Sequence, residues 1–141
     1  MRIVIDTSVL VAGLRSRSGA SAALLERIAS GKIHLLATPA VFLEYEAVLK
    51  REQHGLPLQF VDGLLAELAG CILPVEIRFV WRPQLTDPDD EMVLEAAVNG
   101  QAAAIVTHNR RDFEPAAERF GIRVSSPAQL LQQLRQEEQQ P

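Results

Sequence analysis

Acidic residues gather at one point in the middle of the sequence, where the stretch DPDDE covers residues 87–91. It places Asp87, Asp89, Asp90 and Glu91 immediately before an apolar-patterned run. Carboxylates held close together repel, which raises some of their pKa values unless a cation lies between them. Their hard oxygen atoms are ligands that Mg²⁺ and Mn²⁺ prefer. The cluster is a candidate metal site, although each acid taken singly also fits a solvated loop or the negative charge favoured in a first helical turn.

Three further acids could join this cluster. Asp6 ends the apolar stretch RIVID, Glu44 lies beside the apolar stripe of FLEYEAVL, and Asp112 follows the stretch IVT in IVTHNRRDF. Singly, Asp6 could cap the next segment, Glu44 could be a solvated helix residue, and Asp112 could form a turn. Together the acids are typical of a site in which a divalent ion activates water and stabilises the charge of a phosphate during phosphodiester hydrolysis.

Other chemical motifs are missing from the sequence. The histidines His34, His54 and His108 do not have the spacing of metal ligands, and Cys71 stands alone. The stretch SGK at 30–32 lacks the first glycine of a phosphate-binding loop, and no Gly-x-Gly-x-x-Gly follows a strand. The carboxylates are therefore the best candidate set.

Strands alternate with helices along the chain, and this alternation predicts how the acids are positioned. We expect strands or extended segments at 2–6, 32–38, 71–81 (interrupted by Pro74), 103–107 and 122–126. We expect helices at 21–31, 39–52, 57–70, 90–100, 113–121 and 127–137. Such alternation favours an α/β fold with a parallel sheet and helices on both faces. Sites in these folds lie at the carboxyl ends of the strands, where the acids would meet.

The totals limit the class of protein. The 141 residues suit one domain, and 48% hydrophobic residues are enough for a core. With 14 basic and 18 acidic residues, the net charge of −4 argues against bulk attraction to nucleic acid or an anionic membrane, although a local basic patch remains open. A single cysteine excludes an internal disulfide and favours a reducing, cytoplasmic location. We expect neither a signal peptide nor a membrane span.

Four stretches together resemble one family. MRIVIDTSVLVAGL, ATPAVFLEYEAVLKR, DPDDEMVLEAA and AIVTHNRRDF are similar, in this order, to motifs of the PIN-domain family, and most similar to the PIN toxins of prokaryotic toxin–antitoxin systems, which include VapC-type toxins. The resemblance implies a three-layer α/β/α sandwich around a parallel sheet of about five strands. It also implies an Mg²⁺- or Mn²⁺-dependent endoribonuclease acting on single-stranded RNA, a cognate antitoxin protein as partner, and a homodimer. The PIN-like domain would cover residues 1–135, with a frayed tail at 136–141.

The resemblance also assigns roles to residues. Asp6, Glu44, Asp90 and Asp112 take the positions of the metal-binding and catalytic acids. The supporting polar positions fall on Thr7, Ser8, Thr107 and Asn109. Many relatives have Asp where this chain has Asn109, whereas others have Asn there and an Asp three residues later, so the fourth ligand is either Asn109 or Asp112. The identity of the ligand within DPDDE also stays open between its four acids.

Basic and apolar residues give two further expectations. RNA phosphates could be held by arginines and a lysine near the acidic motifs, namely Arg15, Arg17, Lys50, Arg51, Arg110 and Arg111. A dimer contact could form on the apolar side of the 57–70 helix, which carries Phe60, Val61, Leu64, Leu65 and Leu68.

Two alternatives remain at this point. Asn109 in place of an acid favours a catalytically weakened PIN-like module that binds RNA or regulates. A phosphoaspartate enzyme or receiver domain also places acids at strand ends. A phosphoaspartate enzyme, such as a haloacid-dehalogenase-like phosphatase, would have a second Asp two residues after Asp6, where this chain has Ser8. A receiver domain would have a Lys after a late strand, where this chain has His108.

Overall fold

The computed structural model describes residues 1–140, and Pro141 lies outside the described residues. The strands are β1 (Arg2–Ile5), β2 (His34–Ala37), β3 (Ile72–Pro74), β4 (Ala104–Val106) and β5 (Arg123–Ser125). The helices are α1 (Thr7–Arg15), α2 (Ala20–Ala29), α3 (Pro39–Leu49), the 3₁₀ turn η1 (Glu52–His54), α4 (Leu58–Cys71), α5 (Pro88–Gly100), α6 (Arg110–Arg119) and α7 (Pro127–Gln139).

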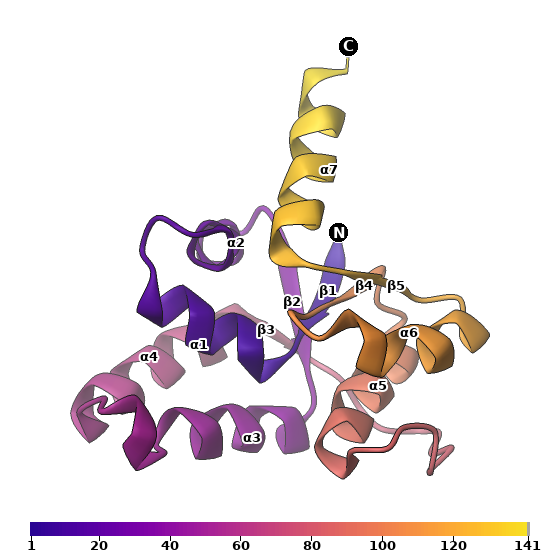
Figure 1. Cartoon of the computed structure of the whole chain (residues 1–141), viewed down its shortest axis with the longest axis horizontal. Coiled ribbons are helices and arrows are strands. Elements are labelled where there is room, and N and C mark those ends of the chain that lie inside the picture. Colours follow the sequence, from indigo (N-terminus) through magenta and orange to yellow (C-terminus); the bar gives the residue numbers. More distant parts are fainter. Residues whose placement is uncertain (141) are drawn as a thin grey trace.

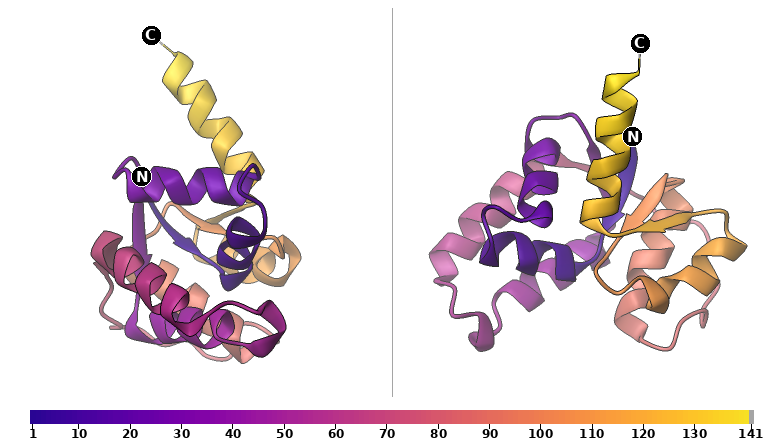
Figure 2. Two further views of the ribbon diagram at one scale, coloured as in Figure 1. Left: turned by 90° about the vertical axis from the view of Figure 1, so that its left-hand side faces the viewer. Right: turned by 45° about the horizontal axis from the view of Figure 1, so that its top comes forward.

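The five strands form one parallel sheet in the order β3-β2-β1-β4-β5. Helices α2 and α7 lie on one side of it and α3 and α5 on the other (Figure 1). Seen from the side, the sheet lies between α2 and the layer that contains α3, α4 and α5 (Figure 2). The prediction of a three-layer α/β/α sandwich with about five parallel strands is confirmed.

The strand order explains why the acidic motifs can meet. From β1 the chain moves outward through β2 to β3, and then crosses back to β4 on the other side of β1. The carboxyl ends of β1 and β4 therefore flank the point at which the direction of winding reverses. Crevices at such points are the usual ligand sites of open parallel sheets. Asp6 and Thr107 are the residues directly after these two strands.

The central strands are buried on both faces, which is why they read as continuous apolar runs. Ile3, Val4 and Ile5 of β1 are fully buried, as are Ile105 and Val106 of β4. A strand covered by helices on both sides has no solvated face, so apolar and polar residues do not alternate along it. This core fixes the strand ends from which the site is built.

Helix α1 is the main element that the sequence reading missed. Its sequence, TSVLVAGLR, is an apolar run with β-branched residues, so it reads as a continuation of the strand before it. The helix packs closely on α2 at Gly13, where an added Cβ would lie 2.6 Å from a methyl carbon of Leu25. This close packing favours the helix over the strand, and it is a tertiary effect.

Helix α5 also packs closely at its end. A Cβ on Gly100 would lie 2.9 Å from side-chain carbons of Leu36 and Val75, so a larger residue there would force these side chains to move. The left-handed residue that ends the helix is Gln101, with φ of 52°. Gly100 therefore contributes space, and the reversal of the chain falls one residue later.

The expected extended segment at 71–81 joins the sheet only over Ile72–Pro74. Beyond it, polar side chains of α5 bind the backbone instead of another strand. The Asn99 side chain accepts from the backbone N–H groups of residues 78 and 79 (both 2.8 Å) and donates to the carbonyl of 79. Glu91 accepts from the N–H groups of residues 84 and 85 (2.6 and 2.7 Å). The segment is thus held against α5 as it approaches the acidic motif.

The expected apolar contact on α4 is partly wrong. Val61, Leu65 and Leu68 are buried in the protein's own core and Leu64 is partly buried, whereas Phe60 and the nearby Leu58 are exposed. The helical period places residues 61, 65 and 68 on one face, and that face covers the core. The proposed dimer surface cannot include them.

The C-terminal helix reaches further than expected. Helix α7 continues through Gln139, beyond the predicted domain boundary at 135, and projects away from the sheet (Figure 1). None of the helices in residues 1–140 is long and apolar enough to cross a membrane.

Candidate active site

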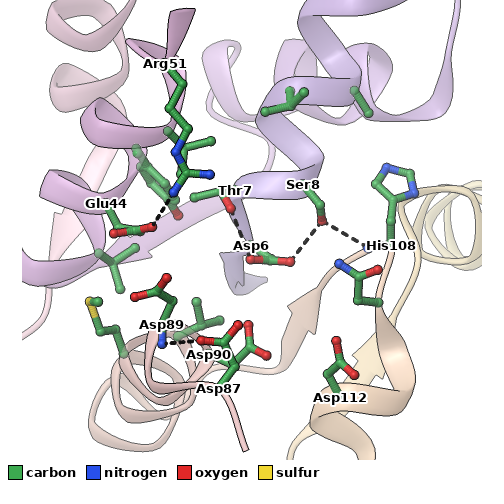
Figure 3. Close-up of a pocket in the computed structure, with 18 of the residues that line it drawn as sticks. Asp6, Thr7, Ser8, Glu44, Arg51, Asp87, Asp89, Asp90, His108 and Asp112 are labelled. Atoms are coloured by element: carbon green, nitrogen blue, oxygen red, sulfur yellow. Dashed lines mark hydrogen bonds and ion pairs between the residues drawn. The ribbon is translucent and has the colours of Figure 1, made fainter. Parts of the chain in front are cut away.

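A cavity of about 700 Å³ opens at the carboxyl ends of β1 and β4. Six carboxylates line it, from the end of β1, from α3, from the start of α5 and from α6: Asp6, Glu44, Asp87, Asp89, Asp90 and Asp112. Figure 3 shows these side chains directed toward one another across the cavity. All four acids to which the sequence assigned metal and catalytic roles therefore line one cavity; their binding of a metal stays a prediction.

Asp6 lies at the floor of the cavity and is 7% exposed. Its Oδ2 accepts hydrogen bonds from Ser8 Oγ (2.9 Å) and Thr107 Oγ1 (2.8 Å), while Oδ1 has only a long contact with Thr7 Oγ1 (3.5 Å). Two hydroxyl donors compensate for the loss of water around a buried carboxylate. They also leave Oδ1 as the oxygen open to a ligand.

The hydroxyl groups beside Asp6 are held by the loop after β4. The backbone N–H of Asn109 donates to Thr107 Oγ1 (3.0 Å), and that of His108 donates to Ser8 Oγ (3.3 Å). Each hydroxyl accepts one hydrogen bond from this loop and donates its own hydrogen bond to Asp6. The small polar residues that the sequence placed beside the first acid therefore orient its carboxylate.

The structure separates the four acids of DPDDE. Asp87 is the N-cap of α5, and its Oδ1 accepts from the backbone N–H of Asp89 (2.9 Å). Glu91 is buried, points away from the cavity and holds the preceding segment. Asp89 and Asp90 remain as the residues of the first turn that line the cavity without a capping role. Of these two, Asp90 is the more buried.

Burial and mutual repulsion perturb two of the acids. The pKa of Asp90 is raised from 3.8 to about 7, mainly because burial disfavours the charged form and then because of the negative charges of Asp6 and Asp87. The pKa of Glu44 is also raised, first by burial and then by the charge of Asp89, while Arg51 partly offsets this. Acids whose protons are retained by burial and by mutual repulsion form a site that a cation would stabilise.

The fourth position involves both candidate residues. Asn109 is the N-cap of α6, makes no capping hydrogen bond with its side chain, and lines the cavity. Asp112 lies one turn later on the same helix and lines it too. The fold therefore brings both residues to the site, and the choice of ligand between them stays a prediction.

The basic residues differ in their relation to the cavity. Arg15 and Arg51 line it, whereas Arg17 lies in the exposed loop outside it. Arg110 and Arg111 line an adjoining hollow that shares Asp112 as a wall. Lys50 is directed elsewhere and forms ion pairs with Asp62 (2.8 Å) and Glu46 (3.3 Å).

Two contacts that the sequence did not reveal support the site. The Tyr45 hydroxyl donates to the carbonyl of Ile5 at 2.6 Å, directly before Asp6, and burial raises the pKa of this tyrosine. The buried Ser21 hydroxyl is hydrogen-bonded to His108 Nε2 at 2.9 Å, which ties α2 to the loop after β4. Tyr45 lies in the apolar stripe of α3 and reads as a packing residue, so only its depth in the fold reveals this hydrogen bond.

The donor set suits a hard divalent cation. Within residues 1–140, no three His, Cys, Asp or Glu side chains are grouped closely enough to form a ready-made metal site. Mg²⁺ does not require such a cage, because it keeps several waters and is commonly bound by one or two carboxylates together with substrate phosphates. A cavity rich in carboxylate oxygens, with an acid as strongly perturbed as Asp90, fits this mode of binding.

Three solved structures with this fold are of VapBC and FitAB complexes. VapBC2 from Rickettsia felis bound to a DNA fragment from their promoter matches with a TM-score of 0.62 and 12% identity, over 89% of this chain and 98% of that chain. VapBC-1 from nontypeable Haemophilus influenzae matches with a TM-score of 0.61 and 11% identity, over 91% of this chain and 99% of that chain. FitAB bound to an IR36 DNA fragment matches with a TM-score of 0.59 and 18% identity, over 89% of this chain and 94% of that chain. At such identities the similarity shows the fold alone.

The sequence comparison covers most of the chain. No curated protein matches this chain, but a family model does. The family model described as PIN domain matches residues 2–111, a range that contains the first three acidic motifs and the start of the fourth. This chain belongs to the PIN domain family.

Proposed function

We propose that the protein is a divalent-metal-dependent endoribonuclease that hydrolyses phosphodiester bonds in single-stranded RNA. The observation that carries the proposal is the meeting of Asp6, Glu44, Asp90 and Asp112 in one cavity at the topological switch of the sheet. Membership of the PIN domain family supports a nuclease. Mg²⁺ or Mn²⁺ is the proposed cofactor, since both prefer carboxylate oxygens.

The chain's own residues have separable tasks in this proposal. Asp6 would hold the ion through Oδ1, because Ser8 and Thr107 donate to its other oxygen and orient the carboxylate. Asp90 must lose its proton before it can act as a ligand, because a protonated carboxyl is a poor donor to a cation. When bound, the ion would supply an activated water and stabilise the negative charge that develops on the phosphate.

Glu44 and Asp112 lie on separate helices on either side of Asp6. Glu44 is partly compensated by Arg51, whose Nη2 lies 4.0 Å from Glu44 Oε1. Asp112 is exposed at the rim. We assign Glu44 to the ligand set and Asp112 to a more distant negative charge that would attract cations into the mouth of the cavity.

We further propose that the protein is the toxin of a type II toxin–antitoxin pair and that its partner is a cognate antitoxin protein. The similarity of its fold to chains of the VapBC and FitAB complexes supports this. A homodimer and a cytoplasmic location belong to the same proposal. Of the α4 residues expected at a dimer contact, the exposed Phe60 and the partly buried Leu64 remain, and the exposed Leu58 lies at the start of the same helix.

Cleavage of a labelled single-stranded RNA tests the proposal. Wild-type protein should cleave it with Mn²⁺ or Mg²⁺, stop when EDTA is added, and resume when the metal is restored. Asp6→Asn should be inactive under all three conditions, whereas Arg119→Gln, on an exposed residue outside the cavity, should cleave as the wild type does. Metal binding by calorimetry without cleavage would favour the alternative of a weakened RNA-binding module.

A further inference from the structure

We infer that the corner of the cavity formed by the end of α1 and by η1 binds a backbone phosphate of single-stranded RNA, with Arg15 as the phosphate ligand and His54 as the residue that positions it. The inference rests on the proposed function and concerns the same cavity. It identifies where the RNA strand runs once it leaves the carboxylates.

Charge is unevenly distributed along the cavity. The Asp112 end adjoins two hollows at the start of α6, and the opposite end adjoins a small apolar hollow under η1, lined by side chains that include Leu14, Leu49 and Leu56. Arg15 and His54 line both the cavity and this apolar hollow. A polyanion is repelled by six carboxylates, so its flanking phosphates are more stable beside a cationic group at either end, Arg15 at this one and Arg110 and Arg111 at the other.

Arg15 differs from Arg51, the other arginine that lines the cavity. Arg51 lies within ion-pair distance of Glu44, and Arg110 pairs with Glu114 at 3.8 Å. Within residues 1–140, Arg15 has no carboxylate at ion-pair distance, although it lines the most acidic hollow of the protein. It is therefore the cavity-lining arginine whose charge is available to an anionic ligand.

The contact between Arg15 and His54 explains how the side chain is held. Arg15 Nη2 donates to His54 Nδ1 at 3.2 Å. A guanidinium has donors only, so Nδ1 must be the acceptor and the imidazole proton lies on Nε2. Nε2 is itself buried, beside the apolar hollow. One of the five N–H donors of the guanidinium is used in this contact, and the fork is oriented while the others remain for a phosphate.

The distance along α1 suits a neighbouring phosphate. Asp6 is the N-cap of α1 and Arg15 is its last residue. Nine residues at a rise of about 1.5 Å put the two Cα atoms roughly 13 Å apart along the axis. Helical side chains lean toward the N-terminus of their helix, which shortens this span. Successive phosphates of one strand advance by at least about 3.4 Å, so Arg15 serves a phosphate a few nucleotides from the cleaved bond.

Equilibrium binding of a fluorescein-labelled single-stranded RNA tests the assignment. The measurement is made in an Asp6→Asn background, with Mn²⁺ present, over a range of salt concentrations. The logarithm of the association constant falls linearly with the logarithm of the salt concentration, and loss of one phosphate contact should make this negative slope shallower by about 0.7. We expect this decrease, with a Kd three- to ten-fold higher, for Arg15→Gln. Arg119→Gln, which makes the same change of charge outside the cavity, should keep both the slope and the Kd of the background protein.

Further variants separate charge from positioning. Arg15→Lys keeps the charge and should retain most of the salt slope while losing part of the affinity. His54→Leu keeps the apolar contacts but removes the acceptor, so it should raise Kd in the same direction as Arg15→Gln. His54→Asn places an amide oxygen near the position of Nδ1 and should restore binding.

The outcomes separate this inference from the proposed function. If the wild type cleaves RNA but Arg15→Gln and Arg119→Gln share the salt slope of the background protein, the inference is overturned and the proposed function stands. If the wild type cleaves no RNA with any divalent metal, the proposed function has failed first. A normal Kd for His54→Leu beside a weakened Arg15→Gln would remove the positioning role of His54.

Discussion

Replacing Asp90 by Asn should make the metal-free protein more stable at alkaline pH. Asp90 has a pKa of about 7 in the folded protein against 3.8 for its ordinary value, so the folded state holds this proton more tightly than the unfolded state does. Between these two pH values the folded protein carries the extra proton, and its stability falls as the pH rises. Above pH 7 the carboxylate is charged in both states, and the full cost of the buried charge is present.

The size of the effect follows from the pKa difference. A difference of about three between folded and unfolded states corresponds to about 4 kcal/mol at pH 8. Asp90 is only partly buried, so solvent screening reduces the expected effect to about 1–2 kcal/mol. Asn has nearly the same shape as Asp and no charge, so Asp90→Asn should gain this stability at pH 8. It should gain clearly less at pH 4.5, where Asp90 is neutral in the folded protein and only its ionisation in the unfolded chain contributes.

Urea unfolding of wild type and variant at pH 4.5 and 8, in EDTA, measures the difference. Asp89→Asn is the matched control, because it removes the same charge from an exposed neighbour and should change stability by less than about 0.5 kcal/mol. With Mn²⁺ at pH 8 the wild type should become more stable than Asp90→Asn, because an ion that binds only the folded wild type stabilises it more as the ion concentration rises. A variant less stable than wild type in EDTA at pH 8, or a difference that does not depend on pH, would refute the reasoning.

Three further outcomes are expected. Asp6→Asn should abolish RNA cleavage and keep the wild-type circular dichroism spectrum; equal cleavage by both purified proteins would contradict its role. Asp112→Asn should raise the Mn²⁺ concentration for half-maximal cleavage by more than Asn109→Ala does, because a carboxylate attracts a hard cation more strongly than an amide oxygen; the opposite order would give the fourth position to Asn109. Tyr45→Phe should lower the free energy of unfolding by about 1–2 kcal/mol, because the carbonyl of Ile5 loses a buried donor; an unchanged urea midpoint would mean that this hydrogen bond contributes nothing net.

The sequence by itself determined the class of fold and the candidate acids. Buried parallel strands must be apolar throughout and their helices amphipathic, so the alternation along the chain could be read directly. Asp6 could be found because a carboxylate directly after a buried strand is costly unless it has partners or a task. Glu44, Asp90 and Asp112 followed from motif order, and all three line the cavity with Asp6.

Tertiary structure decided which of several similar residues faces the site. Asp90 and Glu91 are neighbours of the same charge, and only the direction of α5 against the sheet sends one to the cavity and the other to the backbone of residues 84 and 85. Likewise Arg15 and Arg17 look alike in sequence, but α1 ends between them, so only Arg15 lines the cavity. The sequence gives the period of a helix but not its rotation against the rest of the core, because the rotation is set by close contacts between residues far apart in the chain, such as Gly100 against Leu36.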